Sequence, residues 1–279
     1  MSVVHVPNFG GLRVLTFESR RASELASLIS TYGGKPMLAP ALREVPLESN
    51  VEALEFAAAL VRGEFDMTIF LTGAGTRTLA DAVAPQYPRA VLSDALRRTR
   101  VVARGPKPLA ALRELQVPAW ASAPEPNTWR EVIASIDQKF DGPLTRVRVA
   151  VQEYGVSNPE LLDALRARGA HVTRVPVYRW ALPDNLEPLR HAVLAIAEER
   201  VDVVLFTTGV QLVHFWQIVE EMQREADVRR GLQRAIVASI GPTTSEELHR
   251  HNLIPDFEPS HPKLGALVRE AAERSACLR

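Results

Sequence analysis

The stretch Asp66–Gly73 reads DMTIFLTG, and the stretch Asp202–Gly209, which lies 136 positions later, reads DVVLFTTG. Each is a short apolar run closed by threonine and glycine, a pattern typical of a buried parallel strand followed by a turn. The same offset carries Gly105-Pro106 onto Gly241-Pro242. A register held through so many loops predicts two copies of one α/β unit. Two similar halves that face each other predict a cleft for a small ligand.

The composition is that of a soluble globular chain long enough for two domains. It has 279 residues, 46% of them hydrophobic, and its 33 basic and 33 acidic side chains cancel. Zero net charge argues against a nucleic acid or membrane partner. The single Cys277 excludes a disulfide framework, and the spacing of the histidines predicts no metal site. With no secretory signal or membrane span evident, we expect a cytoplasmic protein.

Apolar strands alternate with amphipathic helices along the whole chain, which predicts parallel sheets covered by helices on both faces. Two segments break the alternation, Lys35–Val45 and Val172–Ala181, each extended with a proline in its middle. They occupy matching positions in the repeat and are expected to link the domains.

Two local patterns carry expectations of their own. Ser157-Asn158-Pro159-Glu160 has the spacing of a capping box with Ser157 as the N-cap. The charged stretch Arg224–Arg234 is expected to be a solvated excursion from the fold.

Four turns between a strand end and a helix start could bind anions: Thr72–Thr76, Gly105–Pro108, Thr207–Gly209 and Gly241–Thr244. Free N–H groups and the helix dipole favour negative charge there, and glycine lets a ligand approach the backbone. The alternative is that these residues serve as turn and N-cap residues. Four such turns, paired by the repeat, favour ligand binding.

Further candidates lie beside these turns. Tyr178, in the second linker, has a phenol that can donate a proton, although it could equally pack between domains. The turn Tyr154–Ser157 has the same ambiguity. Arg20 and Lys107 could grip carboxylates or be solvated surface charges.

The ordered set of these pieces resembles the uroporphyrinogen-III synthase family, the cyclases of tetrapyrrole biosynthesis, from about Leu12 to Leu267. The resemblance is carried by Arg20, Gly33, the Phe70–Gly73 turn, Gly105, the helix with Leu161, Leu165 and Gly169, Val177-Tyr178-Arg179, Phe206-Thr207-Thr208, and Ile240–Thr244. Many members have serine after the threonine of the strand-end turns, where this chain has Gly73 and Thr208-Gly209.

The resemblance implies two similar α/β domains joined by a two-stranded extended linker, with a cleft between them. Domain one would comprise residues 1–38 and 181–279, domain two residues 43–174, and the linkers residues 39–42 and 175–180. Each sequence copy would then contribute to both domains.

The resemblance also implies an activity. A family enzyme closes the linear hydroxymethylbilane to uroporphyrinogen III, with ring D inverted and water lost, through an azafulvene and a spiro intermediate. It is expected to be a monomer without a cofactor, and Tyr178 would assist hydroxyl loss. The residues expected to bind substrate are Arg20, Thr72, Gly73, Gly105, Lys107, Tyr154, Gly155, Ser157, Thr207, Thr208, Gly209, Gly241, Thr243 and Thr244. The alternative is a non-catalytic relative that binds a tetrapyrrole or another anionic small molecule as a sensor or regulator.

Overall fold

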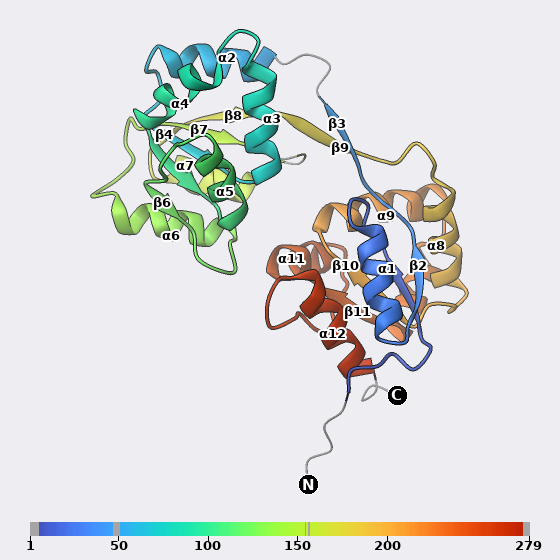
Figure 1. The fold of residues 1–279 in the computed structure, drawn as a ribbon. Helices are drawn as coiled ribbons and strands as arrows, with labels where there is room; N and C mark the ends of the chain where they lie inside the picture. Colours follow the sequence, from blue (N-terminus) through green and yellow to red (C-terminus); the bar gives the residue numbers. More distant parts are fainter. Residues whose placement is uncertain (1–5, 47–50, 154, 156, 276–279) are drawn as a thin grey trace. The chain divides into compact units, whose positions relative to one another are not determined.

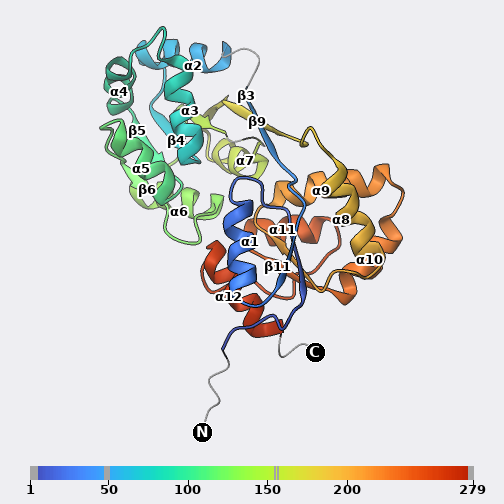
Figure 2. The same cartoon turned by 45° about the vertical axis from the view of Figure 1, so that its right-hand side comes forward.

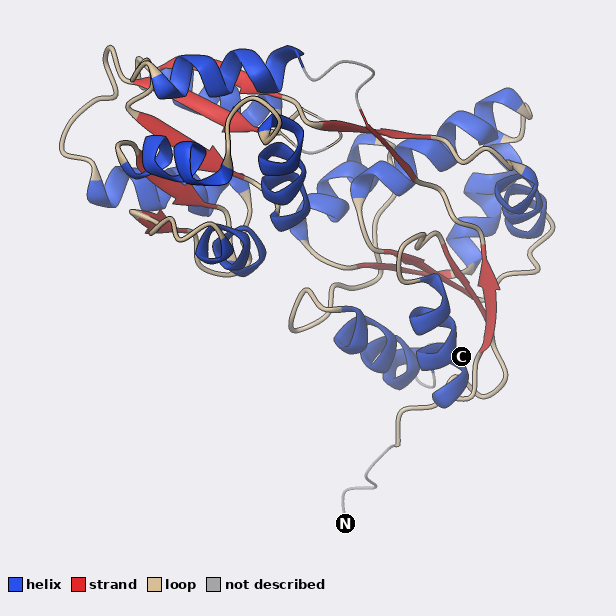
Figure 3. Cartoon of the chain, turned by 45° about the horizontal axis from the view of Figure 1, so that its top comes forward, coloured by secondary structure: helices blue, strands red, loops and turns tan. Residues whose placement is uncertain are grey.

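The computed structural model describes residues 6–46, 51–153, 155 and 157–275, without the side chains of Pro46 and Tyr178. The chain divides into two compact units, one of residues Met1–Arg43 with Ala181–Arg279 and one of residues Glu44–Trp180. Both units are three-layered, with red strands between blue helices (Figure 3). None of the helices in the described ranges is long and apolar enough to cross a membrane.

Unit 1 is built on a four-stranded parallel sheet with the order β11-β10-β1-β2. Its strands are β1 (Arg13–Thr16), β2 (Lys35–Leu38), β10 (Val203–Phe206) and β11 (Ile236–Ser239). Its helices are α1 (Ala22–Thr31), α8 (Glu187–Ala197), α9 (Gly209–Glu221), α10 (Glu225–Arg234), α11 (Pro242–Arg250) and α12 (Leu264–Ser275) (Figure 1).

Unit 2 has a five-stranded parallel sheet with the order β6-β5-β4-β7-β8. Its strands are β4 (Met67–Phe70), β5 (Arg100–Ala103), β6 (Ala121–Ser122), β7 (Arg148–Gln152) and β8 (His171–Val175). Its helices are α2 (Val51–Val61), α3 (Gly73–Val83), α4 (Arg89–Arg97), α5 (Pro106–Glu114), α6 (Trp129–Lys139) and α7 (Pro159–Ala167). The α/β class with helix-flanked parallel sheets, expected from the sequence, is confirmed.

Apolar strand residues alternate between two cores in each sheet, because successive side chains point to opposite faces. In unit 1, Leu15 and Phe206 pack with α8, α9, α10 and α11, whereas Val14 and Leu205 pack with α1 and α12. Unit 2 repeats this division, with α2 to α5 on one face and α6 and α7 on the other. Every residue of β4 and β10 is buried, so these central strands read as continuous apolar runs in the sequence.

The amino edges of the two sheets carry the same arginine–aspartate clamp. Arg13 donates its backbone N–H and Nε to Oδ2 of Asp202, at 2.8 and 3.0 Å. Arg148 does the same to Asp66, at 2.9 and 3.0 Å, and its guanidinium holds the pKa of Asp66 below the ordinary value. The clamps align Arg13 with Arg148, an offset of 135 rather than 136. The first strand of each repeat is therefore shifted by one residue against the rest.

The expectation that Arg224–Arg234 is a solvated excursion is wrong, because most of this stretch forms α10. Val228 and Leu232 are buried, four residues apart on one helical face. The helix lies against α8 (Figure 2), and a Cβ added to Gly231 would stand 1.9 Å from the carbonyl oxygen of Ile196.

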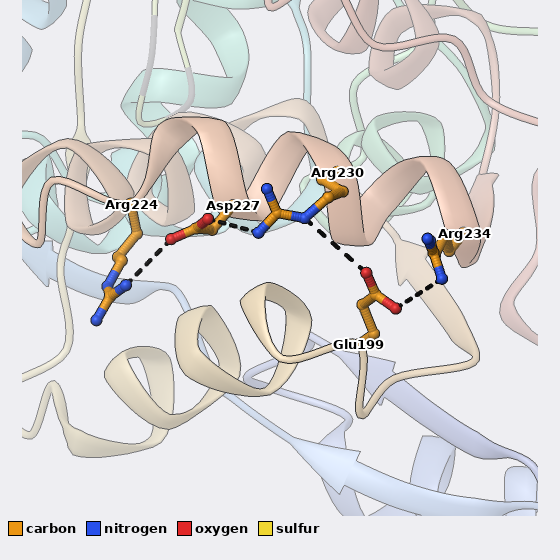
Figure 4. A network of polar contacts seen from close by, with 5 residues as sticks. All are labelled: Glu199, Arg224, Asp227, Arg230 and Arg234. Carbon is orange, nitrogen blue, oxygen red and sulfur yellow. Dashed lines mark hydrogen bonds and ion pairs between the residues drawn. The ribbon is translucent and has the colours of Figure 1, made fainter.

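The charges of α10 form a chain of contacts along the side that faces Glu199, in the loop after α8 (Figure 4). Asp227 pairs with the guanidinium groups of Arg224 and Arg230, at 3.0 and 2.6 Å. Glu199, just after α8, pairs with Arg234 at 2.9 Å. Exposed pairs of this kind contribute little to stability. The packing of its apolar face therefore fixes the position of α10, and the charged pairs on its surface add little to stability.

The chain passes between the units in two strands, β3 (Arg43–Pro46) and β9 (Tyr178–Ala181), which pair with each other as a two-stranded sheet.

A second correction concerns the start of α7. Its N-cap is Asn158, whose Oδ1 accepts from the N–H of Leu161 at 2.9 Å. Ser157 is not the capping residue, because its hydroxyl donates to Oε1 of Glu153 at 2.7 Å.

Candidate functional site

Three helices of unit 1 begin at one edge of its sheet. Strands β1, β10 and β11 are parallel neighbours, so their carboxyl ends and the starts of α1, α9 and α11 meet there. The first N–H groups of a helix have no acceptor within it, and its dipole makes that end positive. This edge is where open α/β sheets bind ligands. Thr207, Thr208, Gly209, Gly241, Thr243 and Thr244 all lie on it.

Thr207 is engaged within the protein. Its hydroxyl donates to Oε2 of Glu18 at 2.7 Å and accepts from the side-chain amide of Gln211 at 2.8 Å. Its backbone N–H donates to Oε1 of Gln211 at 2.9 Å. Gln211 is buried, with 1% of its surface exposed, so the threonine is held from beneath. The geometry makes Thr207 a support for the Glu18 carboxylate.

Thr208 and Gly209 begin α9 and are partly exposed. Thr208 is the N-cap in extended backbone, and its hydroxyl makes no capping hydrogen bond. A Cβ at Gly209 would stand 3.0 Å from the Cβ of Glu247, so this position is tight. The uncapped start of α9 has N–H groups that suit a carboxylate.

The start of α11 has more room. Gly241 is the N-cap with extended backbone, and the nearest atom to an added Cβ is the Cβ of Pro262 at 3.6 Å. Thr243 is exposed, whereas Thr244 is 3% exposed and donates its N–H to the Gly241 carbonyl at 3.0 Å. Thr243 is thus accessible to solvent, and Thr244 belongs to the packed side of the turn.

In unit 2 the matching glycines are packed against protein atoms. A Cβ at Gly73 would stand 2.6 Å from the backbone oxygen of Lys107, and one at Gly105 would stand 2.5 Å from Oδ1 of Asn127. Thr72 caps α3 by accepting from the N–H of Gly75 at 3.0 Å. Close contact between the starts of α3 and α5 therefore requires glycine at residue 73, whether or not a ligand binds.

The turn after β7 is shaped by β9. Gly155 has φ +66, and an added Cβ would stand 1.9 Å from Cδ1 of Trp180, so the indole sits against its Cα. Gly155 also bridges to Arg179 as in a parallel ladder. Tyr154 lies outside the described residues. Tyr178 begins β9, and its side chain lies outside the described part.

Two predicted cations are exposed. Arg20 lies between β1 and α1 in unit 1, and Lys107 lies in the first turn of α5 in unit 2. No group of three or more potential metal ligands comes together among the residues described.

The sequence reasoning missed two acids. Glu18 follows β1 and Glu153 follows β7, each five residues after the clamp arginine of its strand. Aligning the two copies on Arg13 and Arg148, at an offset of 135, pairs Glu18 with Glu153, whereas the offset of 136 does not.

Comparison with known proteins shows the family of the chain. The family model described as Uroporphyrinogen-III synthase HemD matches residues 23–269. The chain is 29% identical over 266 residues to the Uncharacterized protein YjjA of Bacillus subtilis, covering 94% of this chain and 96% of that protein. It is 25% identical over 249 residues to the Putative uroporphyrinogen-III synthase of Methanothermobacter thermautotrophicus, covering 86% and 89%.

Solved structures share the fold. A mutant uroporphyrinogen III synthase from Thermus thermophilus superposes with a TM-score of 0.74 at 24% identity, covering 96% of this chain and all of that one. The uroporphyrinogen-III synthetase from Helicobacter pylori superposes with a TM-score of 0.52 at 17% identity, covering 96% and 100%. At such identities the likeness shows the fold.

Proposed function

The chain belongs to the uroporphyrinogen-III synthase family, and we propose that it closes hydroxymethylbilane to uroporphyrinogen III, with inversion of ring D and release of one water. The observation that carries this proposal is the match of the family model over residues 23–269. It is supported by helix starts at the carboxyl edge of each parallel sheet, since these suit the carboxylates of such a substrate.

The chemistry asks mainly for positioning. The hydroxyl of the hydroxymethyl group on ring A leaves as water once its oxygen takes a proton, and the methylene that stays on the ring completes an azafulvenium cation. The substituted carbon of ring D attacks the resulting methylene, which gives a spiro intermediate that rearranges to the macrocycle. Most of the rate acceleration would come from holding the flexible polycarboxylate in one reactive pose, because its conformational freedom is then lost on binding and not in the chemical step. Helix starts in both units, at α9 and α11 and at α3 and α5, would bind its carboxylates.

Tyr178 is the proposed proton donor to the leaving hydroxyl. A phenol has an ordinary pKa of about 10 and is protonated at neutral pH. Tyr178→Phe removes that proton alone, and we expect turnover to fall at least tenfold, since general acids typically contribute about 10²–10⁴-fold. Turnover equal to that of the parent enzyme, with the fold intact by circular dichroism, would remove Tyr178 from the mechanism.

The deciding assay supplies freshly generated hydroxymethylbilane and separates the oxidised porphyrins by chromatography. Isomer I forms spontaneously from the free substrate, so isomer III in excess of isomer I reports catalysis. Isomer I alone, from protein that melts cooperatively, would refute the proposal.

A further inference from the structure

The two units place an acid at the same point of the repeat and surround it differently. Glu18 and Glu153 each lie five residues beyond the arginine that clamps their strand, Arg13 and Arg148 respectively. Both therefore sit just past the carboxyl end of the first strand of their sequence repeat, β1 for Glu18 and β7 for Glu153. Their surroundings show which of the two can still accept a ligand.

Glu153 is neutralised and nearly saturated. Its side chain is 4% exposed, and its Oε2 accepts from Nε and Nη2 of Arg174 at 3.0 and 2.9 Å. Its Oε1 accepts from the Ser157 hydroxyl at 2.7 Å. A carboxylate has about four lone-pair positions. Three of them are occupied here, two by a cation, so Glu153 is a structural acid.

The hydrogen bonds of Glu18 come from neutral groups and leave spare capacity, although the Arg21 cation also interacts with it electrostatically. Its Oε2 accepts from the Thr207 hydroxyl at 2.7 Å and its Oε1 from the backbone N–H of Arg21 at 3.2 Å. The Arg21 guanidinium makes its hydrogen-bonded ion pair with Glu24, with Nε 2.6 Å from Oε2. No ion pair within the described ranges includes Glu18, which is partly exposed. About two of its lone-pair positions remain open.

The carboxylate of Glu18 is held before any ligand arrives. Thr207, which donates to it, is itself fixed by the buried amide of Gln211 through two hydrogen bonds of 2.8 and 2.9 Å. An acceptor fixed in this way costs little to reorganise when a donor binds. The network lies directly before α9, whose start suits an anion.

An open carboxylate beside anion-binding helix starts repels a ligand that carries only carboxylates. It suits a ligand that also carries N–H groups or positive charge close to its carboxylates. We propose that Glu18 accepts hydrogen bonds from pyrrole N–H groups of the substrate and stabilises the azafulvenium cation, with Thr207 as its positioning residue. This inference rests on the proposed function. Glu18 forms no covalent bond and keeps its charge, and the ring nitrogen keeps its proton. The interaction strengthens as positive charge develops, so it favours the transition state.

The test compares two polycarboxylates that differ in N–H groups. Uroporphyrinogen III, kept reduced under anaerobic conditions, has both carboxylates and pyrrole N–H groups, whereas benzenehexacarboxylate has carboxylates alone. Glu18→Gln keeps an acceptor for the Arg21 N–H and loses the charge. We expect it to bind uroporphyrinogen III about tenfold more weakly, the difference between a charged and a neutral hydrogen bond, and to bind benzenehexacarboxylate equally or more tightly. The opposite sign, tighter binding of uroporphyrinogen III, would overturn the proposal, and so would unchanged binding.

Two further variants separate positioning from net charge. Glu198→Gln removes the same charge from an exposed residue just after α8, at the opposite edge of the sheet, and should leave both affinities unchanged. Thr207→Val should share the loss of uroporphyrinogen III affinity, and Thr207→Ser should restore it. An effect of Glu198→Gln as large as that of Glu18→Gln, or full affinity in Thr207→Val, would contradict the assignment.

The turnover number kcat is a second measurement, and a purely structural role of Glu18 would leave it unchanged. Glu18→Gln should lower kcat for isomer III about tenfold, because charge develops after binding. Failure of the proposed function is recognised separately, as isomer I alone from the parent protein, and the binding comparison still decides whether Glu18 receives N–H groups. Unchanged binding rejects Glu18 in either case, and an unchanged kcat in an active enzyme rejects its stabilisation of the cation.

Discussion

Gly155→Ala should lower the unfolding free energy of unit 2 by more than the cost of placing alanine in the left-handed backbone conformation of residue 155. The residue has φ +66, in the left-handed region, where a side chain costs about 1–2 kcal/mol. An added Cβ would also stand 1.9, 2.2 and 2.6 Å from three atoms of the Trp180 indole. Forcing a methyl group into packed space costs about 1–3 kcal/mol more. The total expected loss of unfolding free energy is about 2–5 kcal/mol, the sum of these two ranges.

Gly142 supplies a matched control in the same unit. It has φ +88, and an added Cβ there would have no atom within 4 Å, so Gly142→Ala carries the backbone cost alone. The difference between the two variants isolates the collision with Trp180. At about 3 °C per kcal/mol, a difference of about 2 kcal/mol lowers the melting midpoint of Gly155→Ala some 6 °C below that of Gly142→Ala.

Calorimetry gives both midpoints, and tryptophan fluorescence follows unit 2, because three of the four tryptophans lie there. In a Trp180→Ala background the collision is gone, so Gly155→Ala should then cost only what Gly142→Ala costs. Equal midpoints for Gly155→Ala and Gly142→Ala in the parent background would show that the indole does not occupy this space, and the reasoning would fail.

Three further outcomes are expected. Asp66→Asn should lower the melting midpoint at neutral pH, and its deficit should shrink as pH falls, because the lowered pKa of Asp66 beside Arg148 contributes stability that is lost as pH falls through the folded pKa; a deficit that is constant from pH 7 to pH 3 would contradict this. Gly73→Ala should cost about 1–3 kcal/mol in urea unfolding, because its Cβ would stand 2.6 Å from the Lys107 carbonyl. Gly241→Ala should keep its melting midpoint, because its nearest neighbour is 3.6 Å away, yet produce isomer III at about a fifth of the parent rate or less, as loss of about 1 kcal/mol implies; full activity would show that the start of α11 does not bind substrate.

The apolar strands and the repeat could be read from the sequence because they depend on local patterns. Asp66–Gly73 and Asp202–Gly209 form equivalent central strands and turns, as their identical spacing predicts. The stretch Arg224–Arg234 was wrongly predicted to be solvated, because its many charges obscured Val228 and Leu232 on one helical face. Burial of that face outweighs the polarity of the rest.

The purpose of the glycines could not be read from the sequence, because it depends on residues far away in the chain. Gly73 is required by the carbonyl of Lys107 and Gly155 by the indole of Trp180, and no local pattern signals either contact. The same holds for Ser157, which has capping-box spacing but donates to Glu153 instead. A polar side chain with a buried carboxylate nearby satisfies that charge in preference to a helix N–H.

Comparison of the two repeat copies distinguishes residues that stabilise the fold from residues that are available to a ligand. The clamps of Arg13 and Arg148 are the same in both units, because the amino edge only has to tie a strand to its neighbour. At the carboxyl edge the same two acids diverge: Glu153 is neutralised by Arg174, whereas the hydrogen bonds of Glu18 come from a hydroxyl and a backbone N–H. A scaffold that needed both acids for stability would neutralise both. The difference supports our proposal that Glu18 accepts a ligand and stabilises the developing cation at this edge of unit 1.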